Sequence, residues 1–120
     1  MIGDTSDLQG VPLDIRDYYD FFTRPIGGNW CNDEIEILRS PTQRFLRKTI
    51  GEIRKADYDY VITFFSGHGC EVDDEIVLTI NGDNEDIMLD DLRNLSQKQL
   101  LIIDCCRCPV IRYGKRMRSA

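Results

Sequence analysis

His68 is the only histidine in the chain, and it lies between two glycines in the segment Ser66–Gly69 (SGHG). This segment directly follows the apolar run Tyr60–Phe65, while a second apolar run, Leu100–Ile103, leads into Asp104–Arg107 (DCCR). A cysteine attacks as its thiolate, which is the minor form at neutral pH, so it needs a base or a cationic partner, and histidine supplies either. Together the two segments indicate a cysteine nucleophile with a histidine partner.

The glycines beside His68 suit such a site. Glycine permits close approach of the backbone, so the imidazole can project into a crevice and a substrate can lie against the main chain. The backbone N–H of Gly69, with that of the nucleophile, is then placed to donate to a developing oxyanion. Alone, a histidine after a strand is usually a polar residue at a sheet edge, and a buried cysteine a small hydrophobe. The pair favours catalysis.

Helices and strands that alternate along the chain must position these residues. Proline in the first turn and apolar spacing predict a helix from Gly10 to about residue 22, and a second helix runs from Ser40-Pro41 to about Ala56. We expect strands at Glu34–Leu38, Tyr60–Phe65, Glu75–Ile80 and Leu100–Ile103. A turn is expected at Asn81–Asp83 and a short helix at Met88–Leu95. This order predicts an α/β domain with a mainly parallel sheet.

The two runs that precede the reactive segments should be strands buried on both faces. In a parallel sheet, ligands bind in the crevice beyond the carboxyl ends of the strands. If Tyr60–Phe65 and Leu100–Ile103 are neighbours, His68 and one cysteine face the same crevice.

Composition bounds the remaining options. The 120 residues suffice for one domain with one core, and 42% hydrophobic with 30% charged residues is typical of a globular protein. With a net charge of −6, the chain as a whole lacks the basic character that is typical of a protein that binds nucleic acid. The charge is uneven: Glu71–Asp91 holds nine acidic and no basic residues, and five basic residues follow Cys106. We interpret these segments as a solvated acidic surface and a basic tail.

The sequence shows no run long enough to span a bilayer and no signal-peptide core in MIGDTSDLQG, so we expect no membrane partner. Five cysteines, three of them within residues 105–108, do not form a secreted disulfide framework. Free thiols in a reducing compartment are the better interpretation, which predicts a cytoplasmic protein.

The motif F-F-S-G-H-G followed by I-I-D-C-C-R resembles the catalytic pair of the caspase-like cysteine peptidases, particularly their metacaspase branch. Matched residue by residue, His68 takes the histidine role and Cys106 the nucleophile, with Cys105 in the place of a small serine or alanine. Upstream, Leu8–Asp14 (LQGVPLD) is similar to the L-x-G-x-x-x-D entry into the first helix of the family. Ser40–Thr42 resembles the helix start that precedes the histidine strand.

This resemblance implies a caspase-like three-layer sandwich, with a p20-type catalytic domain at residues 1–106 and a basic C-terminal tail at 107–120. The fold is expected to be truncated at both ends, since only Met1–Gly3 is available for the first strand and 14 residues follow Cys106. The chain would be a protease of peptide or protein substrates, with the family's link to programmed cell death.

The resemblance also implies cleavage after arginine or lysine. Asp104 and Ser66 match the positions that line an acidic S1 pocket, and Asp7 would add a further acid. A carboxylate in that pocket attracts a basic side chain and repels an acidic one. The chemistry requires no cofactor. Calcium activates many metacaspases, but Glu71–Asp91 does not match an EF-hand loop and surface solvation explains its acids equally well.

Two rival readings stay open. A truncated, inactive caspase-like module could bind or regulate a full-length relative, or a second copy, through the exposed edge that the strand Leu100–Ile103 would leave. A metal site could use His68, Cys70 and the C-C-x-C cluster. Zinc ligands come as spaced pairs, however, and adjacent cysteines are poorly placed to chelate together. We therefore predict no metal site.

Overall fold

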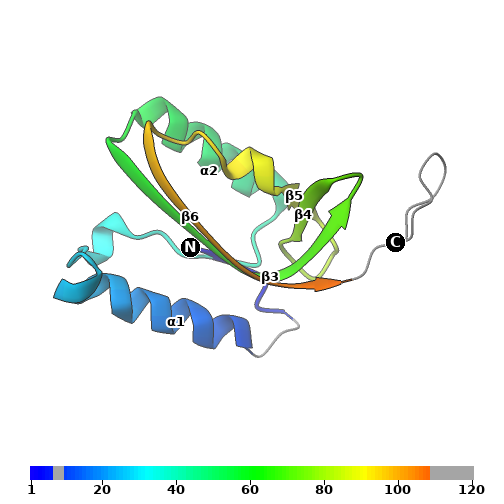
Figure 1. The fold of residues 1–120 in the computed structure, drawn as a ribbon, viewed down its shortest axis with the longest axis horizontal. Helices are drawn as coiled ribbons and strands as arrows, with labels where there is room; N and C mark the ends of the chain where they lie inside the picture. Colours follow the sequence, from blue (N-terminus) through cyan, green and yellow to red (C-terminus); the bar gives the residue numbers. More distant parts are fainter. Residues whose placement is uncertain (7–9, 109–120) are drawn as a thin grey trace.

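The computed structural model describes residues 1–6 and 10–108, with only the backbone for 106–108. It shows one curved sheet with a helix on each face (Figure 1). Helix α1 (Gly10–Thr23) covers one face, and helix α2 (Gln43–Ala56) covers the other. The predicted α/β class and the three-layer sandwich are confirmed. Asp7 and most of the predicted tail lie outside the described residues.

The remaining elements are short, apart from two long strands that pair with each other. The strands are β1 (Ile2–Gly3), β2 (Leu38–Arg39), β3 (Tyr60–Val72), β4 (Glu75–Thr79), β5 (Asp86–Met88) and β6 (Lys98–Cys108). Three 3₁₀ turns complete the described ranges, namely η1 (Pro25–Gly27), η2 (Asn32–Glu34) and η3 (Leu89–Leu92).

Strand β3 organises the sheet. Along one edge it pairs with β6 in parallel from Tyr60 to Cys70. Along the other edge it pairs first with β1, in parallel at Phe65 and Ser66, and then with β4, antiparallel from Gly69. Strand β2 extends the sheet beyond β1, and β5 extends it beyond β4. Of the described strand pairs three are parallel and two antiparallel, so the sheet is mainly parallel as predicted.

Side chains of β3 alternate between two cores. Phe65 packs with Leu46 and Ile50 of α2, whereas Phe64 packs with Ile15 of α1. This period of two is what a strand covered on both faces requires. The odd-numbered residues of β3 therefore face α2, and the even-numbered residues face α1.

The apolar spacing of both helices was interpreted correctly from the sequence. Helix α2 buries Leu46, Thr49 and Ile50 on one side. Its N-cap is Thr42, whose hydroxyl accepts the N–H of Phe45. The helix ends at Ala56, where the sequence predicts its end.

Two predicted elements differ. The strand expected at Glu34–Leu38 is mostly absent, because the Glu34 carboxylate accepts the N–H of Cys31 and closes the turn η2, which leaves only β2. The helix expected at Met88–Leu95 is instead the end of β5 followed by η3. Its apolar residues Leu92 and Leu95 are nevertheless buried, so their spacing reflects core contact rather than a regular helix.

Strand β6 was predicted to be buried on both faces, and that prediction is wrong. Within the described residues β6 pairs with β3 alone, and Leu100 is 43% exposed. The strand lies at an edge, where one row of backbone groups and part of each side chain face solvent. The exposed edge that the sequence analysis anticipated is therefore present.

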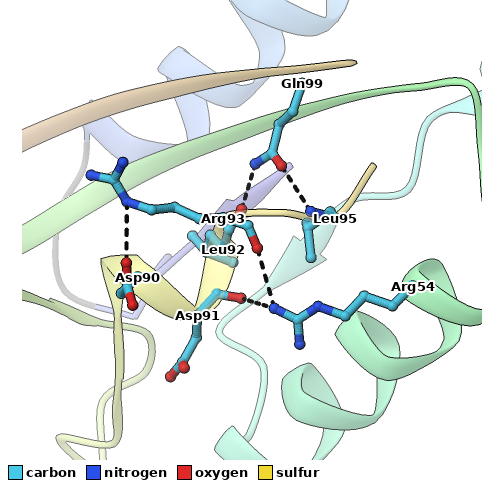
Figure 2. Close-up of polar contacts among 7 residues, drawn as sticks. All are labelled: Arg54, Asp90, Asp91, Leu92, Arg93, Leu95 and Gln99. Atoms are coloured by element: carbon cyan, nitrogen blue, oxygen red, sulfur yellow. Dashed lines mark hydrogen bonds and ion pairs between the residues drawn. The ribbon is translucent and has the colours of Figure 1, made fainter. Parts of the chain in front are cut away.

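The start of β6 is anchored by polar contacts (Figure 2). Gln99 donates from Nε2 to the carbonyl of Leu92 and accepts the N–H of Leu95 over 2.8 Å. Arg54 of α2 donates to the carbonyls of Asp91 and Arg93 over 3.1 and 3.2 Å. These bonds tie the segment before β6 both to the strand and to the helix.

None of the helices in the described ranges is long and apolar enough to cross a bilayer.

Candidate active site

His68 lies inside β3 and not after it. The sequence predicts a strand that ends at Phe65, but β3 continues through Ser66–Cys70 to Val72. It continues because β4 folds back on it through a turn at Asp73 and Asp74, both with positive φ. The glycines are therefore strand residues, and backbone pairing on both edges overrides their weak strand propensity.

The region around His68 is the point where β3 changes neighbours. The last residue of β3 paired with β1 is Ser66, and the first paired with β4 is Gly69. Gly67 and His68 lie between these two pairings. Where strand order changes, neighbouring chains diverge and leave a crevice at the sheet. A crevice beside His68 stays a prediction, and it would lie at this exchange of partners rather than at a strand end.

The backbone places His68 beside Cys106. The two are register partners on the adjacent parallel strands β3 and β6. Neighbouring strands lie about 4.8 Å apart, and register partners share one face of a sheet. The expectation that the two apolar strands are neighbours is confirmed, and the register brings together the histidine and the cysteine that the sequence analysis selected.

Of the two adjacent cysteines, Cys105 belongs to the core on the α2 side. Its Sγ lies 2.8 Å from the point that a Cβ on Gly69 would occupy. Strand alternation places position 106 on the opposite face, together with Ser66 and His68. Gly69 thus has a structural reason to lack a side chain, while its role as an oxyanion donor stays a prediction.

The other predicted pocket residues lie on that same face. Ser66 is 2% exposed, and its Oγ donates to Oδ2 of Asp14 on α1 over 2.9 Å. Asp104 is the register partner of Ser66 and is exposed. The structure therefore bonds Asp14 to Ser66 and pairs Ser66 with Asp104 in the sheet, whereas Asp7 lies outside the described residues. The feature of the sequence that pointed to Asp14 is that it supplies the acidic residue of the helix-entry motif.

Sequence reasoning also missed Asp4, the residue after β1. Its side chain is 3% exposed, and its Oδ1 accepts three hydrogen bonds, from the N–H and Oγ of Ser6 and from the Oγ of Ser40. Burial raises the pKa of Asp4, but the bonds from Ser6 and Ser40 and the nearby charge of His68 outweigh burial. The pKa of this carboxyl is therefore below its usual value, and Asp4 is a buried anion at neutral pH.

No group of three or more His, Cys, Asp or Glu side chains in the described part of the chain is arranged to hold a metal ion. A cavity of about 550 Å³ lies at the amino end of β3, between Ile53 of α2, Trp30 and Tyr60. No predicted catalytic residue lines it.

Comparison with known proteins tests the family. The family model of the caspase domain matches residues 2–119, which is nearly the whole chain and includes both reactive segments. No curated protein and no solved structure gave a match. A helix on each face of a mainly parallel sheet, with a histidine and a cysteine in register on adjacent parallel strands, agrees with that match. The chain belongs to the caspase-domain family of cysteine peptidases.

Proposed function

We propose that this protein is a cysteine endopeptidase in which Cys106 is the nucleophile and His68 the proton carrier. The observation that carries the proposal is the direct register of His68 with Cys106 on adjacent parallel strands. Side chains at such paired positions can come within hydrogen-bonding distance of one another, which the pairing of a thiolate with an imidazolium requires.

The reaction proceeds in two steps. The thiolate of Cys106 forms a bond to the carbonyl carbon, and the C–N bond breaks as the imidazolium of His68 gives its proton to the departing amine. Water then adds to the thioester, His68 takes its proton, and the Cys106 thiolate leaves as the carboxylic acid forms. Backbone N–H groups that include Gly69 stabilise the oxyanion in both steps.

The substrate residue before the scissile bond is proposed to be arginine or lysine. Ser66 is bonded to Asp14, and Asp104 is the register partner of Ser66. The Asp14 carboxylate is thereby bonded to a buried hydroxyl on the His68 face of the sheet, and Asp104 occupies the neighbouring register position. A guanidinium can bind carboxylates in bidentate fashion, whereas an acidic substrate residue is repelled.

Fluorogenic peptides that end in arginine, lysine or aspartate test this function, each with and without calcium. We expect turnover of the arginine and lysine peptides, loss of turnover in Cys106→Ala, and unchanged turnover in Cys31→Ala, which removes an exposed thiol. Folded protein that hydrolyses none of the peptides would exclude the peptidase.

A docking module is the second candidate, and the exposed edge of β6 favours it. An edge strand pairs readily with another chain, here a caspase-like relative or a second copy. Cys106→Ala would then bind its partner as the parent does. A Leu100→Lys variant, which places a charge on that edge, should weaken binding, and equal binding by both would exclude this edge.

A further inference from the structure

We propose that the cavity at the amino end of β3 binds an extended peptide segment of a partner chain, which pairs with the open edge of β3 as an added strand. The cavity is lined by the first residues of β3, whereas His68 lies towards the other end of that strand. The inference therefore goes beyond the proposed function and does not depend on it. The segment that fits is apolar at its centre, carries a hydroxyl there and has basic residues at its ends.

The edge of β3 that faces β1 is open over its first residues. Strand β6 pairs with β3 from Tyr60 onwards, but on the opposite edge β1 pairs only at Phe65 and Ser66. Within the described residues, the backbone groups of residues 60–63 that point to the β1 side have no strand partner. These same residues line the cavity. A row of unpaired N–H and C=O groups is a template on which an extended peptide adds a strand.

The opposite wall of the cavity consists of residues 32–36. In the sheet order β2-β1-β3, β1 separates this side from β3, yet β1 contributes only Ile2 and Gly3. In line with β1, the space between β3 and residues 32–36 is the cavity. The strand predicted at Glu34–Leu38 has no neighbour there with which to pair. A segment in the cavity would lie between the two walls as β1 does further along.

The cavity has the size and the surroundings that a strand needs. Its volume is about 550 Å³, within the range of about 300–1,000 Å³ that is typical of ligand pockets. Leu46 and Ile50 of α2 line one side, and Phe22 of α1 and Phe64 line the other. The side chains of a strand alternate between two faces. An inserted strand would therefore find apolar contacts for both of its faces.

Two buried hydroxyls at the cavity have no hydrogen-bond partner among the described residues. Thr49 and Thr63 are each 7% exposed, and both line the cavity. By strand alternation Thr63 faces α2, which carries Thr49 on its buried side. Buried polar groups in proteins are almost always hydrogen-bonded. Two such hydroxyls at one cavity indicate a polar group of the ligand, and a hydroxyl can both donate and accept.

The charge of the lining residues selects the ends of the segment. Asp33, Glu34 and Glu36 line the cavity and are exposed, and no lysine, arginine or histidine of the described chain lines it. Basic residues at the ends of the segment are therefore attracted, and acidic ones are repelled. Trp30 and Tyr60, whose ring centroids are 6.2 Å apart, lie at the same cavity. Aromatic rings of this kind also attract a cation.

Trp30 makes the test direct, because it is the only tryptophan of the chain and lines the cavity. The probe is the acetylated and amidated peptide Lys-Val-Thr-Val-Ile-Lys, added to Cys106→Ala so that it is not cleaved. We expect a saturable change in the emission of Trp30. A peptide with glutamate in place of both lysines should not bind, nor should one that is N-methylated throughout and cannot donate N–H bonds. No change with the first peptide, or an equal change with all three, overturns the proposal.

The buried hydroxyls are tested by substitution. Thr63→Val, which keeps the shape and removes the hydroxyl, should weaken binding about tenfold, the scale of one hydrogen bond. Thr79→Val on β4, away from the cavity, is the matched control and should bind as the parent does. Replacing the threonine of the peptide by valine should cost a similar factor with the parent and little more with Thr63→Val. Equal affinity of the two protein variants for the probe overturns the proposal.

Hydrogen exchange separates an added strand from other modes of binding. Exchange of the backbone amides in residues 60–63 should slow on binding, because N–H groups on the open edge gain partners. Unchanged exchange at saturating peptide overturns the proposal, even if Thr63→Val fails to fold. Because these measurements use Cys106→Ala, peptide binding at this cavity and peptide cleavage succeed or fail separately.

Discussion

Ser66 on β3 donates a hydrogen bond to Asp14 on α1, over 2.9 Å and across 52 positions of the chain. The bond links the strand that carries His68 to the helix on the same face. A hydroxyl as buried as that of Ser66 needs such a partner. Because Asp14 accepts through Oδ2, its second carboxylate oxygen would be the one to contact the arginine of the proposed substrate.

Asp14→Asn should reduce cleavage after arginine. The substitution removes the charge but keeps an oxygen that can accept from Ser66, so the fold is expected to persist. A hydrogen bond to a charged group contributes about 1.5–3 kcal/mol, which is roughly a ten- to hundredfold loss in kcat/KM for an arginine peptide. The measurement is kcat/KM for matched peptides that end in arginine or in uncharged glutamine. Asp20→Asn, an exposed acid on the same helix, is the control, and an equal loss for both peptides would contradict the prediction.

The two adjacent cysteines should behave differently on substitution. Cys106→Ala should abolish turnover without loss of stability, because the thiol acts in chemistry. Cys105→Ala should keep turnover and lower the free energy of unfolding by about 1 kcal/mol, since Cys105 packs against the core. Urea unfolding and peptide turnover measure the two effects. Loss of turnover in folded Cys105→Ala would show that the wrong thiol has been assigned.

Gly69→Ala should destabilise the protein, because the new methyl group would lie 2.8 Å from Sγ of Cys105. Overpacking of this kind costs about 1–3 kcal/mol. The pair Gly69→Ala with Cys105→Ala should recover part of that loss, because the sulfur is gone. A double-mutant cycle in urea measures the coupling, and a purely additive result would rule out the contact as its cause.

Acid should weaken the fold through Asp4 and Glu85. Both carboxyls have a lowered pKa, Asp4 as described, and Glu85 through bonds from the Asn81 side chain and the Gln43 N–H. The unfolded values are about 3.9 for Asp and 4.3 for Glu. The stabilisation is therefore present above these values and is lost as pH falls through the lower folded values. Urea midpoints measured from neutral pH into acid should fall over that range, and less steeply in Asn81→Ala; a flat profile would contradict both assignments.

The Gln99 contacts should matter for stability more than their position at the start of an edge strand suggests. Gln99→Leu removes the bonds to Leu92 and Leu95 and leaves their backbone groups unsatisfied, at about 1–3 kcal/mol for each buried group. Thermal unfolding compares this variant with Lys98→Gln, an exposed neighbour that should be neutral. Equal midpoints for the two variants would show that water replaces the bonds.

Local patterns predicted much of this fold. The apolar spacing of α1 and α2 and the β-forming runs of β3 and β6 each carry their signal within a few residues, and all four elements are present. The glycines at positions 67 and 69 made the continuation of β3 hard to predict, because pairing with β4 and β6, rather than local propensity, makes that segment a strand. The long-range contacts of Asp4 and Asp14 escaped notice for a similar reason. Ser40 lies 36 positions from Asp4 and Ser66 lies 52 positions from Asp14, and the helix-entry motif that contains Asp14 does not reveal its partner.

The pairing of β6 with β3 also determines which of the two cysteine positions shares a face with His68. Because two cysteines follow one another, a slip of β6 by one residue would exchange positions 105 and 106 between the α2 face and the His68 face, since such a shift turns every side chain to the opposite side. Such a slip would leave the amino-acid sequence of the strand unchanged and still remove the proposed nucleophile from the His68 face. Gln99, bonded to Leu92 and Leu95 before the strand begins, opposes that slip. The register of β6, as much as the choice of residues, would thus decide whether the proposed nucleophile lies beside His68.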